Sequence, residues 1–215
     1  MPKHFLIVAL IPIIILAPGG CARKPVRDIE SLKRIIEEMR EQNRSACVKG
    51  CTLFEGDSNI ELIKVQDYFP TPACNYAYRG STTGDILGRR ERVRELQPRA
   101  IVLLAGGNDL VKSVPVEQID ANYAKLIRYY RGICKKVYCI SNLPVHPGIF
   151  ITNDDIQSLN LMLAKRCRNL GVVYIDVFPL LYRDGGLNPD YALDLVHLNE
   201  AGRNVMMEEV KRHLR

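Results

Sequence analysis

The sequence has no tryptophan, no low-complexity tract and no internal repeat, and only four of its 215 residues are histidines. Without repeats or biased segments, the default is a single domain with its own core, for which this length is sufficient. Apolar residues make up 47% and charged residues 25% of the chain, which is the balance of a globular protein. The composition therefore predicts one folded domain preceded by an N-terminal segment.

The N-terminal segment lacks an apolar run long enough to cross a membrane comfortably. Phe5 to Ala17 is a 13-residue apolar run, interrupted by Pro12, after a basic start. This length is typical of a signal peptide. Cys21 follows small residues and resembles a bacterial lipoprotein processing site. We expect residues 1–20 to be a signal peptide, Cys21 to carry a lipid anchor, and the protein to be exported to the bacterial cell envelope, held at the membrane and facing the periplasm or the exterior. The alternative is an uncleaved N-terminal anchor.

The chain also lacks a strong excess of either charge. Its formal net charge is +6, and cleavage before Cys21 would remove one lysine and leave +5. The densest basic run, residues 89–94, is interrupted by Glu91 and contains no aromatic residue. Such mixed charge is typical of a solvated helix face, so no nucleic-acid partner is expected.

Cysteine is not scarce. Apart from Cys21 there are six, an even number, and an exported protein can form disulfides. Fifteen pairings are possible, and the sequence does not choose among them. Two of the six form a Cys-x3-Cys pair, but no second pair and no histidine accompany it, so no metal site is expected. The six are Cys47, Cys51, Cys74, Cys134, Cys139 and Cys167.

Residues 21–46 are predicted to be an amphipathic helix or linker ahead of a domain at 47–215. Apolar residues between Val26 and Met39 recur at helical spacing, with charges of both signs between them. Because the polar face carries both signs, packing against protein is favoured over binding to a membrane surface.

Beyond residue 47, short apolar segments alternate with helical patterns. This alternation predicts a parallel sheet covered on both faces. Five strands suit a flavodoxin-like three-layer α/β/α sandwich, in which chemistry lies at the carboxyl ends of the strands. The predicted strands are 51–55, 74–78, 100–105, 136–141 and 172–176, and the predicted helices are 60–68, 85–96, 116–130, 154–170 and 200–214.

Four short polar blocks fall at this edge of the predicted sheet. Three follow predicted strands and one precedes the last predicted helix. Gly, Asp, Ser and Asn are also common in turns and helix caps, so each block alone has a purely structural alternative. The blocks are Gly56-Asp57-Ser58, Arg79-Gly80-Ser81, Gly106-Gly107-Asn108-Asp109 and Asp194-Leu195-Val196-His197.

In this order and spacing the blocks resemble those of the SGNH hydrolases, the GDSL-type lipase and esterase superfamily, from about Leu53 to Gly202. Asn160 also falls at a position frequent in that family. The resemblance implies a hydrolase with this three-layer α/β/α fold and without a metal or organic cofactor. It also implies a nucleophile, an acid and a base, three oxyanion donors and two supporting residues. In that order these are Ser58, Asp194 and His197; the N–H groups of Ser58 and Gly80 with the Asn108 side chain; and Asp57 with Gly107.

The histidines support the same base independently. A serine hydroxyl is a weak nucleophile until a base takes its proton, and histidine serves this role near neutral pH. His197 has Asp194 three residues before it, and a carboxylate so placed can hold the imidazole in one tautomer. The other three lie in the targeting segment, between two prolines, and two residues from the C-terminus: His4, His146 and His213.

The expected activity is that of a serine esterase working through an acyl-serine intermediate. An envelope location favours short acyl groups, O-acetyl above all, on envelope or extracellular glycans. Two alternatives stay open: an esterase of lipids or thioesters from the same family, and a catalytically silent envelope protein that binds a glycan or a partner. We also expect residues 142–153, with Phe150, to line one side of the acyl pocket.

Overall fold

The computed structural model describes residue 34, residues 37–38 and 40–41, and residues 47–214. The predictions for residues 1–20 and Cys21 lie outside this part of the chain. The described residues between 34 and 41 are helical. The chain divides into two units, residues 1–41 and 42–215, and the fold below is that of the second unit.

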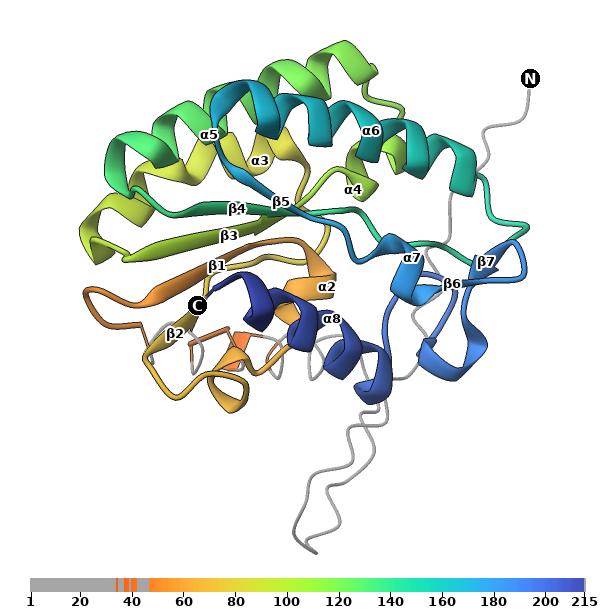
Figure 1. Cartoon of the computed structure of the whole chain (residues 1–215), viewed down its shortest axis with the longest axis horizontal. Helices are drawn as coiled ribbons and strands as arrows, with labels where there is room; N and C mark the ends of the chain where they lie inside the picture. Colours follow the sequence, from red (N-terminus) through yellow and green to blue (C-terminus); the bar gives the residue numbers. More distant parts are fainter. Residues whose placement is uncertain (1–33, 35–36, 39, 42–46, 215) are drawn as a thin grey trace, which may run out of the picture. The chain divides into compact units, whose positions relative to one another are not determined.

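A five-stranded parallel sheet runs through this unit in the order β2-β1-β3-β4-β5 (Figure 1). Every residue of the third strand is buried, because a parallel sheet covered on both faces has no solvent side. The predicted flavodoxin-like sandwich is confirmed. The strands are β1 (Thr52–Gly56), β2 (Ala73–Asn75), β3 (Ala100–Leu104), β4 (Val137–Ile140) and β5 (Val173–Ile175).

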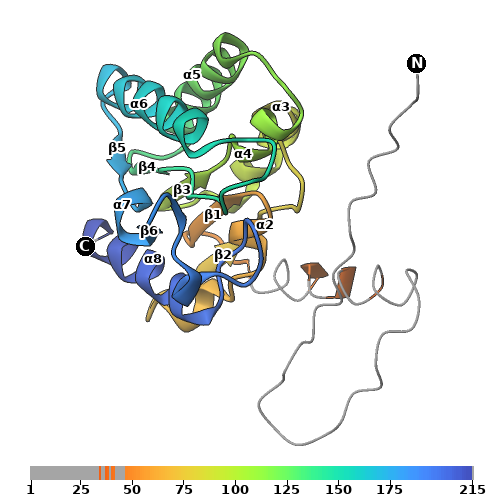
Figure 2. The same cartoon turned by 90° about the vertical axis from the view of Figure 1, so that its right-hand side faces the viewer.

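Helices cover both faces of the sheet and bury one apolar cluster on each (Figures 1 and 2). One face is covered by α3 (Thr83–Arg89), α5 (Val116–Ile133) and α6 (Asn153–Leu170). The other is covered by α2 (Ser58–Glu61), α7 (Phe178–Leu181) and α8 (Glu200–His213).

Two predicted helices are shorter than expected. The helix predicted at 60–68 is the four-residue α2 followed by a 3-10 turn at Val65–Asp67. The Asn75 amide donates to the carbonyls of Ile60 (2.7 Å) and Ile63 (2.8 Å), so a side chain binds both carbonyls where the helix ends. The helix predicted at 85–96 is α3 followed by a 3-10 helix at Arg90–Leu96.

The prediction that residues 89–94 form a solvated helix face is wrong for Arg89. The Arg89 side chain is only 14% exposed and contacts the fully buried Glu55. Helix α4 (Gly107–Val111) and the small hairpin of β6 (Tyr182–Arg183) with β7 (Gly186–Leu187) were not predicted.

One disulfide joins Cys47 to Cys74 and ties the entry of β1 to β2. The other four cysteines of the described domain are buried free thiols: Cys51, Cys134, Cys139 and Cys167. Within the described residues no helix is long and apolar enough to span a bilayer. The same residues hold no cluster of three or more metal-ligating side chains.

Candidate active site

Three side chains form a continuous hydrogen-bonded chain at the carboxyl end of β1. His197 Nε2 lies 2.9 Å from Ser58 Oγ, and His197 Nδ1 lies 2.7 Å from Asp194 Oδ2. Ser58 and His197 are 139 residues apart in the chain. The fold thus brings together the predicted nucleophile, base and acid in hydrogen-bonding order, whereas their catalytic roles stay predictions.

Ser58 is placed by the sharp exit of the chain from β1. A Cβ on Gly56 would lie 2.4 Å from the Leu104 carbonyl oxygen, so only glycine lets β1 run this close to β3. Asp57 then accepts from the Asn59 N–H (2.9 Å) and caps α2, which makes Ser58 the first helical residue. A first-turn N–H has no acceptor inside its own helix, so the Ser58 N–H is suited to bind an oxyanion.

Asp194 fixes the orientation and the tautomer of His197. Its Oδ1 accepts from the backbone N–H groups of Val196 (2.9 Å) and His197 (2.8 Å), while Oδ2 faces the His197 ring. Burial raises the pKa of Asp194, but these hydrogen bonds outweigh it, and the pKa lies below its usual value. Because the carboxylate stays ionised, Nδ1 carries the ring proton and Nε2 is free to accept from Ser58.

Asp57 has a different environment from Asp194. Burial, with added repulsion from Asp109 and Glu61, raises the pKa of Asp57 to about 7. The side chain caps α2 as described above. The predicted supporting role of Asp57 in the reaction stays a prediction.

The two remaining oxyanion candidates lie on neighbouring segments, Gly80 on the loop before α3 and Asn108 in the first turn of α4. Gly80 has a φ of +72°, and nothing lies within 4 Å of where a Cβ would be, so its backbone is open to an approaching ligand. The Asn108 amide nitrogen donates to the Ser81 carbonyl at 3.1 Å. This contact fixes which end of the amide is nitrogen and leaves its second N–H for an oxyanion.

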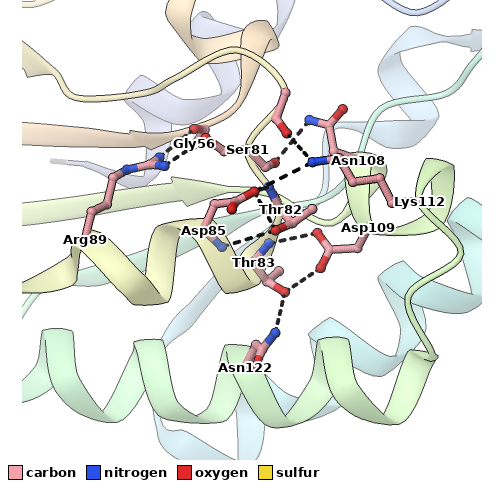
Figure 3. A network of polar contacts seen from close by, with 11 residues as sticks. Gly56, Ser81, Thr82, Thr83, Asp85, Arg89, Asn108, Asp109, Lys112 and Asn122 are labelled. Atoms are coloured by element: carbon pink, nitrogen blue, oxygen red, sulfur yellow. Dashed lines mark hydrogen bonds and ion pairs between the residues drawn. The ribbon is translucent and has the colours of Figure 1, made fainter.

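The loop that carries Gly80 is held at successive residues, as Figure 3 shows. Lys112 Nζ donates to the Gly80 carbonyl (3.1 Å). The Thr83 N–H and hydroxyl donate to the two oxygens of Asp109 (2.8 and 2.6 Å), and Thr82 shares a capping box with Asp85. Burial raises the pKa of Asp109 above its usual value, although the two hydrogen bonds from Thr83 oppose this rise. These contacts hold the loop that carries Gly80 in one geometry.

Asp109 and Thr83 were missed as site residues by sequence reasoning. Asp109 was noted only as part of a block, and no local signal links it to Thr83, which lies 26 residues earlier.

The block before Asn108 depends on a buried asparagine pair. Gly106 has a φ of +111°, and a Cβ there would lie 2.9 Å from Leu159 Cδ2 and 3.2 Å from Asn142 Oδ1. Asn160 holds Asn142 by accepting from its N–H (2.7 Å) and donating to its carbonyl (3.0 Å). Gly107 is the first residue of α4, one residue before Asn108.

The segment 142–153 contacts the turn that carries Asp194 and His197. The His146 N–H donates to the Leu195 carbonyl (2.8 Å), which joins this segment to the turn between Asp194 and His197. Phe150 is 67% exposed and Leu195 48% exposed. A small buried cluster in this region consists of Val145, Ile151, Ile156 and Phe178, with Leu110, Ile149 and Val196 packed against it. The predicted role of this segment in an acyl pocket stays a prediction.

Comparison with known families gives a match over most of the domain. The model of the GDSL-like Lipase/Acylhydrolase family matches residues 64–205. This span contains Gly80, Asn108, Asp194 and His197, and it begins after Ser58.

Solved structures share the fold. A protein from Streptococcus pneumonia, provisionally described as a platelet activating factor, aligns with a TM-score of 0.73 and 26% identity over 85% of this chain and 92% of its own. A GDSL-like lipase from Bacteroides thetaiotaomicron aligns with a TM-score of 0.72 and 23% identity over 83% and 96%. Axe2, an acetylxylan esterase from Geobacillus stearothermophilus, aligns with a TM-score of 0.65 and 15% identity over 79% and 96%.

Among curated proteins, the N-acylneuraminate cytidylyltransferase of Streptococcus agalactiae (strain NEM316) is 23% identical over 157 residues. The match covers 72% of this chain and 36% of that relative, so the chain spans little more than a third of its length.

Proposed function

Because the chain belongs to the GDSL-like lipase/acylhydrolase family and is an ester hydrolase, we propose that Ser58, His197 and Asp194 are its catalytic triad. The observation that carries the proposal is the hydrogen-bonded chain from Ser58 Oγ through the His197 ring to Asp194. Asp194 is proposed to orient the ring and to stabilise the imidazolium that forms during the reaction.

In the first half-reaction His197 Nε2 takes the proton of the Ser58 hydroxyl as Oγ attacks the ester carbonyl. The carbonyl oxygen becomes an oxyanion, for which the Ser58 N–H, the Gly80 N–H and the Asn108 amide are the proposed donors. Collapse of this intermediate breaks the bond to the alcohol, which leaves with the proton from His197. Water, activated by the same nitrogen, then releases the acid and restores Ser58.

For the substrate, we propose short acyl esters, in particular O-acetyl groups on envelope or extracellular glycans. Two similarities support this choice: Axe2 is an acetylxylan esterase, and the curated relative is named for an acylated sugar. The Cys47–Cys74 disulfide supports the proposed exported location, because disulfides persist in oxidising compartments. The lipid anchor at Cys21 remains part of this proposal.

A lipid ester is the second candidate, and a specific observation favours it. Leu193 and Leu195, on either side of Asp194, expose large apolar side chains, and so does Phe150 in the segment that contacts this turn through His146. Such side chains would contact a longer acyl chain or an aggregated lipid. The Bacteroides thetaiotaomicron protein with the same fold is described as a GDSL-like lipase.

The test compares p-nitrophenyl acetate with longer p-nitrophenyl esters, using the wild type and Ser58→Ala. The proposal expects turnover that falls to background in Ser58→Ala, with the acetyl ester preferred. A preference that rises with chain length would favour the lipid candidate. A folded wild type without turnover on any of these esters or on acetylated glycans would overturn the esterase proposal in favour of a binding protein.

A further inference from the structure

We propose that Arg89 is a positioning residue for the esterase reaction: its guanidinium holds the turn that carries Ser58 and the loop that carries Gly80 in one fixed geometry. The inference rests on the proposed function, since it concerns the same oxyanion. The sequence singled out Arg89 only as part of a basic run, and the triad mechanism gives it no role.

The contacts of Arg89 span two segments that are far apart in the sequence (Figure 3). Nη2 donates to Glu55 Oε1 (2.6 Å) and to the Gly56 carbonyl (3.2 Å), at the end of β1. Nη1 donates to the Ser81 hydroxyl (2.8 Å). One planar group therefore joins the strand end two residues before Ser58 to the residue directly after Gly80.

Ser81 passes this constraint to the third proposed donor. Its hydroxyl binds Arg89, and its carbonyl accepts from the Asn108 amide at 3.1 Å. Arg89, Ser81 and Asn108 thus form one connected path. Because all three oxyanion candidates are attached to this path or to β1, a shift of Arg89 changes their spacing together.

Burial holds the Arg89 guanidinium rigidly in these contacts. Glu55 is fully buried and the Arg89 side chain is 14% exposed, with its guanidinium 4.7 Å from the centre of the Tyr78 ring. The Tyr78 N–H also donates to the Gly56 carbonyl, at 3.1 Å. Burial raises the pKa of Glu55 to about 7, although the Arg89 charge opposes this rise. A buried ion pair is weak evidence for stability, so its geometry is the more informative property here.

Arginine is needed at this position for its shape as well as its charge. Its fork presents several N–H donors in a fixed plane, whereas a lysine ammonium is a point charge on a flexible stem. A lysine could stay paired with Glu55 but could not hold Glu55, Gly56 and Ser81 in one plane. Oxyanion donors act only where they are correctly placed, and a displacement of about 1 Å can cost roughly 100-fold in rate.

The test uses the full chain with Arg89→Lys, Arg89→Gln and the double variant Arg89→Gln/Glu55→Gln. The double variant leaves no unpaired buried charge, so it guards against simple failure to fold. Arg90→Gln is the matched control, because Arg90 is the next residue but its guanidinium binds the Leu87 carbonyl (2.6 Å) and lies over the Tyr129 ring. Active sites are counted by titration with diisopropyl fluorophosphate, so that misfolded molecules do not lower the measured kcat.

We expect kcat per titrated site on p-nitrophenyl acetate to fall about 10- to 100-fold in all three variants, with KM within about twofold of the wild type. The Kd of a small alkylboronic acid should rise by a similar factor, because its tetrahedral adduct with Ser58 occupies the oxyanion position. Arg89→Lys should stay close to the wild type in thermal stability. Arg90→Gln should leave kcat, KM and Kd unchanged.

The inference is overturned if a folded variant without the arginine fork keeps kcat within about threefold of the wild type. It is also overturned if kcat falls while the boronic acid binds as tightly as before, since the loss would then not involve the oxyanion. A wild type without ester turnover would overturn the proposed function, and the inference with it. An active wild type with unaffected Arg89 variants would overturn the inference alone.

Discussion

Replacing Asp194 by asparagine should abolish nearly all activity while leaving the fold intact, because the structure dictates how the new amide must sit. Asp194 Oδ1 accepts from two backbone N–H groups, those of Val196 and His197. In Asp194→Asn the amide oxygen must take this position, since an NH2 group there would face two donors. The amide nitrogen then points at His197 Nδ1, which becomes an acceptor, so the ring proton moves to Nε2.

A ring protonated at Nε2 cannot take the proton of Ser58. In serine proteases the corresponding change lowers kcat by about 10⁴, which corresponds to about 5.5 kcal/mol in the activation free energy. Asp194→Ala should lose less activity than Asp194→Asn. The His197 side chain is 23% exposed, so water can form a hydrogen bond with Nδ1 and both ring tautomers become available. The order of these two variants is specific to the tautomer argument.

The assay is kcat on p-nitrophenyl acetate per titrated active site, with thermal unfolding as the check on folding. Asp190→Asn is the matched control, because Asp190 lies in the same region but is exposed and pairs with Arg183 (2.6 Å). Its kcat should equal that of the wild type. An Asp194→Asn variant that keeps a tenth of the activity, or that is more active than Asp194→Ala, would refute the reasoning.

Three further predictions concern stability and specificity. Asp57→Asn keeps an N-cap but removes a carboxyl whose pKa is raised to about 7. Because the folded state binds this proton more tightly than the unfolded state, the free energy of unfolding of the wild type should fall as the pH rises from about 4 to about 7. Urea unfolding at several pH values should show a smaller fall in the free energy of unfolding for the variant. An equally steep decline in the variant would contradict this. The double variant Cys47→Ser/Cys74→Ser removes the disulfide, which joins residues 27 positions apart, and should lower the free energy of unfolding by about 3.5 kcal/mol. A loss below about 1 kcal/mol would argue against the loop-entropy estimate. Phe150→Ala should alter the ratio of acetyl to longer-chain hydrolysis without changing thermal stability, because the side chain is 67% exposed; an unchanged chain-length profile would exclude it from the acyl pocket.

The strands and the contact between Asp194 and His197 could be predicted because their signals are local, whereas the catalytic roles of Ser58, Asp194 and His197 stay predictions. The buried run of β3 is apolar at every position, and Asp194 and His197 lie within one turn of each other. Elimination among four histidines needed no knowledge of the fold.

Features that depend on distant partners could not be predicted. Asn75 ends α2 through contacts 12 and 15 residues away. In the sequence Arg89 resembles a surface residue among other charges, but its side chain contacts the buried Glu55, which lies 34 residues earlier. The disulfide was one of many possible pairings until Cys47 and Cys74 were brought together. In each case the missing information is which side chains meet across the sheet.

The proposed nucleophile and base come from opposite ends of the domain's sequence, which has a consequence for the newly made protein. Ser58 follows the first strand, whereas His197 directly precedes α8, whose Arg203 donates to the Leu62 carbonyl at the end of α2 (2.7 Å). A nascent chain that has not yet released α8 from the ribosome holds the serine but has no docked imidazole. Such a chain lacks the proposed base that would activate the serine. Ester turnover can therefore serve as a reporter of folding, because it should begin only when α8 packs against α2.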